Sequence, residues 1–281
     1  MDVFSLPATR ALLRAALDED LASGDLTSQL TVRAGTRGRA EIRTKEPITV
    51  AGLPLVERIA EAATADVDVE PIARDGDRAA AGDLLVRLVG DARSLLAIER
   101  VTLNLLQHLS GIATATAEFV AAVAGCGCRI VDTRKTLPGL RTLQKYAVRV
   151  GGGFNHRQRL DDGILVKDNH IVAAGGLTAA VLAAQAGAPH GIKVEVECSS
   201  LAEVTEALNV GAEIILLDNM SVAEIGAAVQ RIAGRAVVEA SGGVTLSSVR
   251  AIAETGVGVI SVGALTHSAA AVDISMTLFM E

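Results

Sequence analysis

The sequence predicts an α/β protein in which a short parallel (β/α) barrel follows a separate α+β domain. In the second half of the chain, six short apolar runs each end in charged or glycine-rich residues and precede an Ala/Leu-rich helical stretch; they begin at residues 129, 163, 192, 213, 236 and 258. The start-to-start spacings of 34, 29, 21, 23 and 22 residues suit successive βα units. Such units form a parallel sheet covered by helices.

The polar residues of the third run favour a barrel over an open sheet. In IKVEVEC, residues 192–198, apolar side chains alternate with Lys193, Glu195 and Glu197, so the two sets lie on opposite faces of a strand. A strand buried on both faces of an open sheet is more often apolar throughout. One charged face, with functional residue types at the carboxyl end of each strand, is typical of a barrel with its site at that mouth. Six clear units predict a shorter barrel than the usual eight-fold one.

The first hundred residues follow another pattern, which predicts a separate domain. Strand-like runs cut by Gly, Pro and Asp turns surround one helical segment at 55–63, a mixture that indicates an α+β arrangement. The strand-like runs lie at 25–32, 38–55, 66–73 and 83–90.

A long helical connector is expected between the two domains. It covers 94–124 and is expected to break near Gly111, which places the boundary near residue 107. The expected division is a first domain over 1–107, a barrel domain over 108–268, and C-terminal residues 269–281 packed with the first domain.

Composition excludes several classes of protein. Half of the 281 residues are apolar, which is enough for a sizeable core. Aromatic residues make up only 2%, which argues against a site for single-stranded nucleic acid, where rings usually stack on bases. The three cysteines form no C-x-x-C pair, so neither a disulfide framework nor a zinc site is indicated and a reduced cytoplasmic setting fits best. No segment is typical of a signal peptide or a membrane span.

The charge distribution predicts a small polyanionic ligand. The chain has a formal net charge of −7, yet residues 129–167 hold nine Lys and Arg against three Asp, a local balance of +6 that leaves −13 for the remainder. A cleft lined with one sign of charge concentrates ligands of the other sign.

Cations and glycines follow the first barrel strand. Arg134 and Lys135 come directly after the apolar run and are expected at the barrel mouth, although a solvated helix start would give the same spacing. Three glycines at 151–153 precede Asn155-His156-Arg157. Adjacent glycines give up side-chain contacts and cost chain entropy, so they indicate a backbone that approaches a ligand closely. A flexible loop would explain the glycines but not the His-Arg pair.

Lys167, Glu197 and Asp218 end the next three strands. Carboxylates at adjacent strand ends can hold a hydrated Mg²⁺ or the hydroxyls of a ribose. The alternatives are a surface turn around Lys167 and salt bridges from the two acids to neighbouring Lys and Arg.

Glycines end the last two strands. Ser241-Gly242-Gly243 and Gly263-Ala264 each stand just before a helix, where backbone N–H groups can face an anion, and barrel enzymes often bind phosphate at these loops. His267 on the last loop could add a donor, although a lone histidine is more often packed.

Taken together and in this order, these strings resemble the nicotinate-nucleotide pyrophosphorylase family, also called quinolinate phosphoribosyltransferases. The matching segments are DTRKTLPGLRTLQKYAVRVGGGFNHR, LVKDNH, EVEC, LLDN, EASGG and VGALTHS, with ASGDLTS at 22–28 and ERVTLNLLQHLSGIAT at 99–114. The resemblance covers nearly the whole chain. It implies an N-terminal α/β sandwich joined to an incomplete (β/α) barrel of about six to seven strands, in a homodimer whose active site is shared across the interface.

The resemblance also implies a reaction and the residues that carry it. Quinolinate and phosphoribosyl pyrophosphate, with Mg²⁺, give nicotinate mononucleotide, CO₂ and pyrophosphate in NAD biosynthesis. The residues implied for quinolinate are Thr133, Arg134, Lys135, His156, Arg157 and Lys167, with Arg100 from the partner subunit. Those implied for phosphoribosyl pyrophosphate are Lys167, Glu197, Asp218, Ser241, Gly242, Gly243, Gly263, Ala264 and His267.

Lys135, Glu197 and Asp218 are the implied catalytic residues. The two acids match the positions that hold the ribose and its Mg²⁺, either directly or through water. Lys135 is a candidate proton donor to the carbon that loses its carboxylate.

One position departs from the family pattern. The family usually has N-H-R-x-G-L, and here Arg159 replaces the glycine. If that glycine needs a positive φ, Arg159 is strained or the turn has changed, which affects the placement of Arg157.

Two rivals remain. One is the related ModD protein of molybdenum-transport operons, which shares the T-R-K-T motif, although LVKDNH and LRTLQKYAV favour the pyrophosphorylase. The other is an anion-binding homologue without catalysis, for which Lys135, Glu197 or Asp218 would be expected to be missing.

Overall fold

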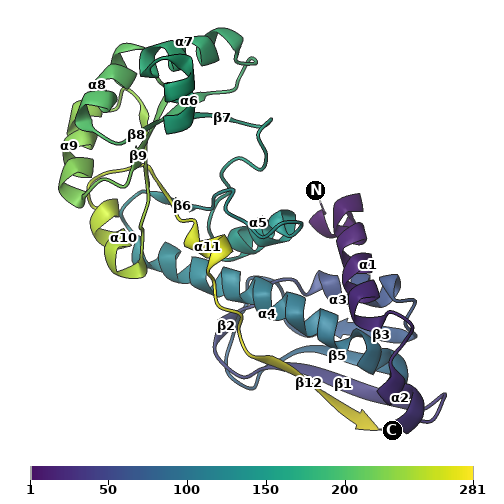
Figure 1. Ribbon diagram of the computed structural model, residues 1–281. Helices are drawn as coiled ribbons and strands as arrows, with labels where there is room; N and C mark the ends of the chain where they lie inside the picture. The colour runs from purple at the N-terminus through teal and green to yellow at the C-terminus, as the bar shows by residue number, and fades with distance from the viewer. Residues whose placement is uncertain (1, 281) are drawn as a thin grey trace. The chain divides into compact units, whose positions relative to one another are not determined.

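The structure, a computed structural model, describes residues 2–280 and consists of two compact units (Figure 1). The first unit comprises the residues up to Ala117, Thr136–Gly152 and those from Thr266 onward, and the second comprises Glu118–Lys135 and Gly153–Leu265. This division differs from the predicted one: helix α4 (Ala92–Ala122) continues past residue 107, and Thr136–Gly152, expected in the barrel, belongs to the first unit.

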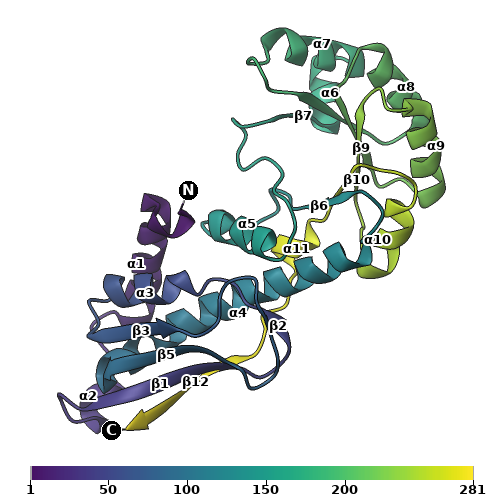
Figure 2. The same cartoon turned by 180° about the vertical axis from the view of Figure 1, so that it is seen from behind.

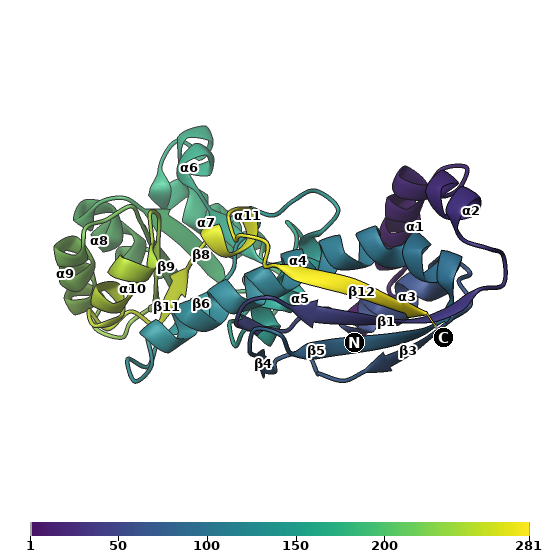
Figure 3. The ribbon, with the colours of Figure 1, turned by 90° about the horizontal axis from the view of Figure 1, so that it is seen from below.

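An antiparallel sheet, in the order β12-β1-β5-β3, organises the first unit. Its strands are β1 (Arg37–Thr44), β3 (Val67–Pro71), β5 (Leu84–Asp91) and β12 (Ile274–Met280). The C-terminal strand β12 pairs with β1, so the first and the last strand of the chain share one sheet (Figure 3). Apolar side chains of this sheet and of α4 form one buried cluster, which includes Ala40, Ile42, Val86, Leu88, Leu95, Leu103 and Leu106.

Short elements complete the first unit. They are the 3₁₀ helix η1 (Val3–Ser5), α1 (Pro7–Leu21), α2 (Leu26–Thr31), β2 (Ile48–Thr49), α3 (Pro54–Ala62), β4 (Arg78–Ala79) and α5 (Arg141–Val150).

The predicted strand at 25–32 is wrong, because Leu26–Thr31 forms helix α2. The side chain of Asp25 accepts a hydrogen bond from the Ser28 N–H at 3.0 Å. An aspartate in this position satisfies one of the unpaired N–H groups of a first helical turn. The local cap therefore overrides the strand-like pattern of the segment.

The predicted break near Gly111 is also wrong, since α4 is continuous from Ala92 to Ala122. A Cβ atom at Gly111 would collide with the backbone of Ala270. The glycine thus permits two segments to pack closely, a use of its missing side chain that does not require the helix to end.

The second unit contains a parallel sheet in the order β6-β11-β10-β9-β8-β7 among the described residues. Its strands are β6 (Arg129–Val131), β7 (Ile164–Val166), β8 (Val194–Cys198), β9 (Ile214–Asp218), β10 (Val237–Ser241) and β11 (Val259–Ser261). All six predicted βα strands are confirmed. Helices cover the outer face of the curved sheet (Figures 1 and 2); they are α6 (Asp168–Ala174), α7 (Leu177–Gly187), α8 (Leu201–Asn209), α9 (Val222–Ile232) and α10 (Leu246–Ala253).

The barrel is incomplete, because β6 and β7 form the two edges of the sheet. Across residues 2–280, only one isolated bridge, Val131 to Phe154, adds to the free edge of β6. The chain leaves the second unit after Lys135 and returns at Gly153, so the strand that would extend this edge is reduced to a single residue pair. The short helix α11 (Ala264–His267) follows β11.

Within residues 2–280, no single helix has both the length and the apolar composition needed to cross a membrane. Helices α6 and α7 have the required length and apolar composition only when they are taken together, and the chain bends by 93° between them.

Candidate active site

A cavity of about 440 Å³ lies at the carboxyl ends of the barrel strands. Every strand of the sheet ends at it, as expected for a barrel mouth. The polar residues that line it are Thr133, Arg134, Lys135, His156, Arg157, Lys167, Glu197, Asp218, Asn219, Glu239, Ser241 and Ser261, with Gly242 and Gly243. Most of the predicted site residues thus come together in one place.

Two arginines form the cationic wall of the cavity. Arg134 is half-buried, and its Nε has no hydrogen-bond partner among the described residues. Arg157 donates from its guanidinium to the Gly163 carbonyl at 2.9 Å. Burial lowers the pKa of Arg157, and the charge of Arg134 lowers it further. Two partly desolvated cations that repel each other favour an anion between them.

A fully buried carboxylate holds this wall in place. Asp132 is 0% exposed and accepts hydrogen bonds from the Asn155 side chain at 2.6 Å and from the His156 N–H at 2.9 Å. It thereby ties the end of β6 to the segment that carries Arg157. Neither Asp132 nor Asn155 was predicted to have a role, because nothing in the spacing of 23 residues between them indicates contact.

Arg159, which replaces the family's usual glycine, does not adopt a positive φ. Its N–H donates to Asp162 at 3.0 Å and its guanidinium pairs with Asp161 at 2.8 Å. The turn therefore accommodates a side chain without the strain considered above, and the Gln158 N–H also donates to Asp162.

The acids at the ends of β8 and β9 face the cations from the opposite side. Glu197 pairs with the Lys167 ammonium at 3.0 Å, and Asp218 accepts from the Asn219 amide at 2.6 Å. Each carboxylate thus has one interaction that fixes it and oxygen atoms left for a ligand. Asn219 also has a positive φ of 54°, and its N–H donates to the Ser241 carbonyl at 2.9 Å.

Gly242 is matched to Asn219. It has a φ of +93°, and a Cβ at this position would collide with the Asn219 side chain. Only glycine combines this backbone conformation with so close a contact. The Ser241-Gly242-Gly243 loop is therefore fixed against the acidic end of β9, just before α10.

A second cavity, of about 380 Å³, lies at the amino ends of the strands. Exposed residues such as Asp162, Gly191 and Lys193 line it, so it reaches the surface. His156, Arg157 and Glu239 line both cavities. These three residues therefore stand between the barrel mouth and its opposite end.

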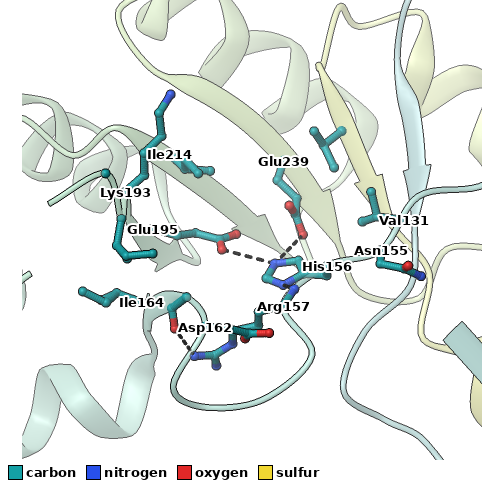
Figure 4. A pocket seen from close by; sticks show the side chains of 14 residues that line it. Val131, Asn155, His156, Arg157, Asp162, Ile164, Lys193, Glu195, Ile214 and Glu239 are labelled. Atoms are coloured by element: carbon teal, nitrogen blue, oxygen red, sulfur yellow. Dashed lines mark hydrogen bonds and ion pairs between the residues drawn. The ribbon is translucent and has the colours of Figure 1, made fainter. Parts of the chain in front are cut away.

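His156 lies between two buried glutamates, as Figure 4 shows. Its Nε2 is 3.2 Å from Glu195 and 3.7 Å from Glu239. Its Nδ1 accepts from the Arg157 N–H at 2.7 Å, which places the ring proton of a neutral imidazole on Nε2, toward the glutamates. Burial raises the pKa of Glu239 to about 7, and the neighbouring charge of Glu195 adds to this. No sequence pattern indicated a role for Glu239, and the alternation along β8 indicated only the face on which Glu195 lies.

The three side chains also have a donor set that could hold a metal ion, with ligand atoms within 4.8 Å of one another. The tautomer opposes this use. A histidine that binds a metal through one ring nitrogen normally donates a hydrogen bond from the N–H of the other. In His156, Nδ1 is an acceptor, so the hydrogen lies on Nε2, the nitrogen that faces the two glutamates.

Four predicted residues do not line the mouth cavity. Gly263 and Ala264 follow β11 in the second unit but are absent from the cavity wall. Arg100 and His267 belong to the first unit. Arg100 is 57% exposed and lies 3.8 Å from Glu99, and His267 contacts the Ser268 hydroxyl at 2.5 Å. The roles of these four residues stay predictions.

Comparison with known proteins identifies what the chain is similar to. Residues 25–110 match the model of the quinolinate phosphoribosyl transferase N-terminal domain, and residues 112–277 match that of the C-terminal domain. The nicotinate-nucleotide pyrophosphorylase [carboxylating] of Mycobacterium leprae is 45% identical over 96% of this chain and 97% of its own length. A probable enzyme of the same name from Synechocystis is 44% identical, covering 95% and 91%.

Solved structures agree with the sequence matches. NadC from Streptococcus pyogenes superposes with a TM-score of 0.91 at 43% identity, covering 96% of each chain. Nicotinate-nucleotide pyrophosphorylase from Ehrlichia chaffeensis gives a TM-score of 0.92 at 40% identity, covering 96% of this chain and 98% of its own.

The buried Glu239 should make stability depend on pH. The pKa of Glu239 is raised from 4.5 to about 7 in the folded protein. Protonation of Glu239 therefore favours the folded state fully below pH 4.5, and this contribution to the free energy of unfolding is lost as the pH rises from 4.5 to 7. Glu239→Gln keeps the shape without the charge, so its thermal midpoint should exceed that of the native protein above pH 7, by the equivalent of about 3 kcal/mol. The advantage should disappear near pH 4.5. A difference between the two proteins that is the same at pH 5 and pH 8 would contradict the burial of a titrating carboxyl here.

Proposed function

The chain belongs to the quinolinate phosphoribosyltransferase family, and we propose that it converts quinolinate and phosphoribosyl pyrophosphate to nicotinate mononucleotide, CO₂ and pyrophosphate. It is a pentosyltransferase of pyridine nucleotide biosynthesis, a nicotinate-nucleotide pyrophosphorylase (carboxylating). One observation carries the assignment of this reaction to the barrel mouth. A single cavity joins a cationic wall, two acids at adjacent strand ends and a glycine loop before a helix, which are the groups that a dicarboxylate and a phosphorylated ribose require.

We propose that quinolinate binds on the cationic wall. Its two adjacent carboxylates match the paired guanidinium groups of Arg134 and Arg157, of which Arg134 has a buried Nε available. Lys135, which follows β6, and Lys167, which follows β7, add charge. The Thr133 hydroxyl accepts from the Lys135 N–H at 3.0 Å, which shapes the loop. Charge-assisted contacts of this kind give both affinity and orientation.

We propose that the sugar substrate lies across β8 to β10. Glu197 and Asp218 would hold the ribose, and the N–H groups of the loop at Ser241 to Gly243 would bind the 5′-phosphate, with α10 behind them adding the favourable end of its dipole. Lys167 contacts Glu197, so it stands between the two substrates and can contact either.

The reaction follows from this placement. As pyrophosphate leaves, positive charge develops on the anomeric carbon, and the carboxylates of Glu197 and Asp218 stabilise it. The ring nitrogen of quinolinate attacks this carbon. The alkylated nitrogen then stabilises the electron pair that remains on the ring when the adjacent carboxylate leaves as CO₂.

Magnesium is part of the proposal. Glu197 and Asp218 supply the carboxylate oxygens that this hard cation prefers, and each has an oxygen beyond its protein partner. They would hold the ion directly or through water. When bound, it would neutralise the negative charge of the departing pyrophosphate.

We also propose that the protein forms a homodimer in which Arg100 of one subunit enters the active site of the other. Arg100 is a largely exposed cation outside the βα repeats, and its one described ionic contact, to Glu99, is 3.8 Å long. A surface pair of this kind contributes roughly 0–1 kcal/mol, so it gives little reason for a cation at this position.

The activity itself is the first test. Purified protein with quinolinate, phosphoribosyl pyrophosphate and Mg²⁺ should form nicotinate mononucleotide and release CO₂ in equal amounts, detected by chromatography and by labelled carboxylate. Binding of quinolinate without product would instead favour an anion-binding protein that has lost catalysis.

Asp218→Asn should raise the Mg²⁺ concentration needed for half-maximal activity, since the amide keeps the shape but loses the charge. We expect an increase of about tenfold, corresponding to about 1.4 kcal/mol. Asp161→Asn, which alters an exposed acid on the turn, serves as the control and should leave the titration unchanged. If Asp218→Asn and the native protein give superimposable Mg²⁺ titrations, Asp218 is not a metal ligand.

Subunit complementation tests the shared site. Mixing Arg100→Ala with Lys135→Ala places both defects in one site of the heterodimer and leaves the other site intact, so up to about half of the native activity should return. Mixing Lys135→Ala with Lys167→Ala is the matched control, since both defects lie in the barrel and neither site is then intact. An inactive first mixture, despite proven exchange of subunits, would show that Arg100 serves its own subunit.

A further inference from the structure

The proposed reaction needs a proton inside the mouth cavity. When the carboxylate leaves as CO₂, its carbon–carbon bond breaks and the electron pair stays on the ring carbon, where a new carbon–hydrogen bond must form. An acid that holds its proton at neutral pH and reaches the cavity is required. Lys135 is the candidate by resemblance, and it is an exposed residue at the rim.

Glu239 reaches the mouth cavity from the interior of the barrel. It lies on β10 two residues before Ser241, so its side chain stands one layer deeper in the barrel on the same face. It lines the mouth cavity together with Arg134 and Arg157. Its side chain is 6% exposed, and Oε1 has no hydrogen-bond partner in the described part of the chain.

The surroundings of Glu239 favour a bound proton. Glu195 on β8 and His156 face it (Figure 4), and Ser261 on β11 hydrogen-bonds to it. His156 and Ser261 lower the pKa of Glu239, but burial and the charge of Glu195 raise it by more. Glu195 is also buried, and its Oε1 likewise lacks a partner. Two carboxylates this close and this dry cannot both be charged at low cost. The raised pKa of Glu239 described above is the expected result.

Glu195 differs from Glu239 in its access. Glu195 lines only the second cavity, whereas Glu239 lines both. Glu195 contacts His156 Nε2 at 3.2 Å, so it holds the imidazole and disfavours the charge of Glu239. Glu195 therefore acts through His156 and Glu239, whereas Glu239 itself can reach a substrate in the mouth cavity.

We propose that Glu239 donates the proton that replaces the departing carboxylate, and that the second cavity supplies its replacement from water. This inference rests on the proposed function. The Glu239 O–H bond breaks, the ring carbon–hydrogen bond forms, and Glu239 is left as a carboxylate. A water molecule that enters from the second cavity then returns one proton to Glu239 directly and leaves as hydroxide, so the cycle balances without an oxidant or reductant.

Single-turnover kinetics of Glu239→Gln test the proposal. Formation of protonated product should slow by at least tenfold, because general acids contribute about 10²- to 10⁴-fold, while the quinolinate Kd measured by calorimetry stays within threefold. Glu239→Asp keeps the acid but draws it back by one methylene, so it should lose less than Glu239→Gln. Glu254→Gln, at an exposed acid paired with Arg250, is the control and should match the native rate.

The outcomes separate this proposal from the proposed function. If the native protein makes no nicotinate mononucleotide, the function itself fails. If it does and Glu239→Gln is within twofold of the native rate, or loses rate and quinolinate affinity by the same factor, Glu239 is not the acid and Lys135 takes its place as the candidate. Should Glu239→Gln fail to fold, Glu239→Asp decides: a loss of threefold or more at unchanged affinity supports the proposal, and an unchanged rate overturns it.

Discussion

The buried carboxylate of Asp132 is the constraint on which the rest of the site depends. The chain leaves the barrel after the first strand, β6, and returns after an excursion of 17 residues, at the edge of the sheet that β6 forms. There, backbone pairing is limited to the bridge between Val131 and Phe154. Two charge-assisted hydrogen bonds from Asn155 and His156 to Asp132 supply the missing restraint, each worth about 1.5–3 kcal/mol in a buried setting. Arg157 follows directly, so the position of the cationic wall is set by a negative charge that never meets the ligand.

This arrangement gives the barrel two polar layers with different tasks. The upper layer, at the strand ends, pairs cations and acids that can bind charged substrates. The lower layer consists of His156, Glu195 and Glu239, where charge is restricted by burial. Because strand residues on one face repeat every second position, Glu195 and Glu197 share a face but lie in different layers. Their environments differ accordingly: Glu195 is buried, and Glu197 contacts Lys167, which is half-exposed.

The sequence predicted the repeated units well, because each one carries its own local signal: an apolar run, a polar end and a helix of suitable length. It predicted the mouth residues for the same reason, since strand ends converge in any parallel barrel. It failed where a tertiary contact outweighs the local pattern. Gly111 looked like a helix break because the approach of Ala270 is invisible from the sequence. Residues 25–32 looked like a strand bounded by turn residues, and the capping role of Asp25 was not recognised. Asp132 and Glu239 were missed because burial depends on partners that lie far along the chain.

The contact between Gly242 and Asn219 limits how this protein can diverge. Two segments from different strands share a space too small for one additional carbon atom, and each has a left-handed backbone that suits few residue types. Any larger residue at position 242 therefore meets the Asn219 side chain and would have to hold a backbone conformation that L side chains rarely adopt. A smaller residue at position 219 would remove only the first of these two obstacles. Change in this loop is consequently confined to position 219, and glycine is expected to persist at position 242.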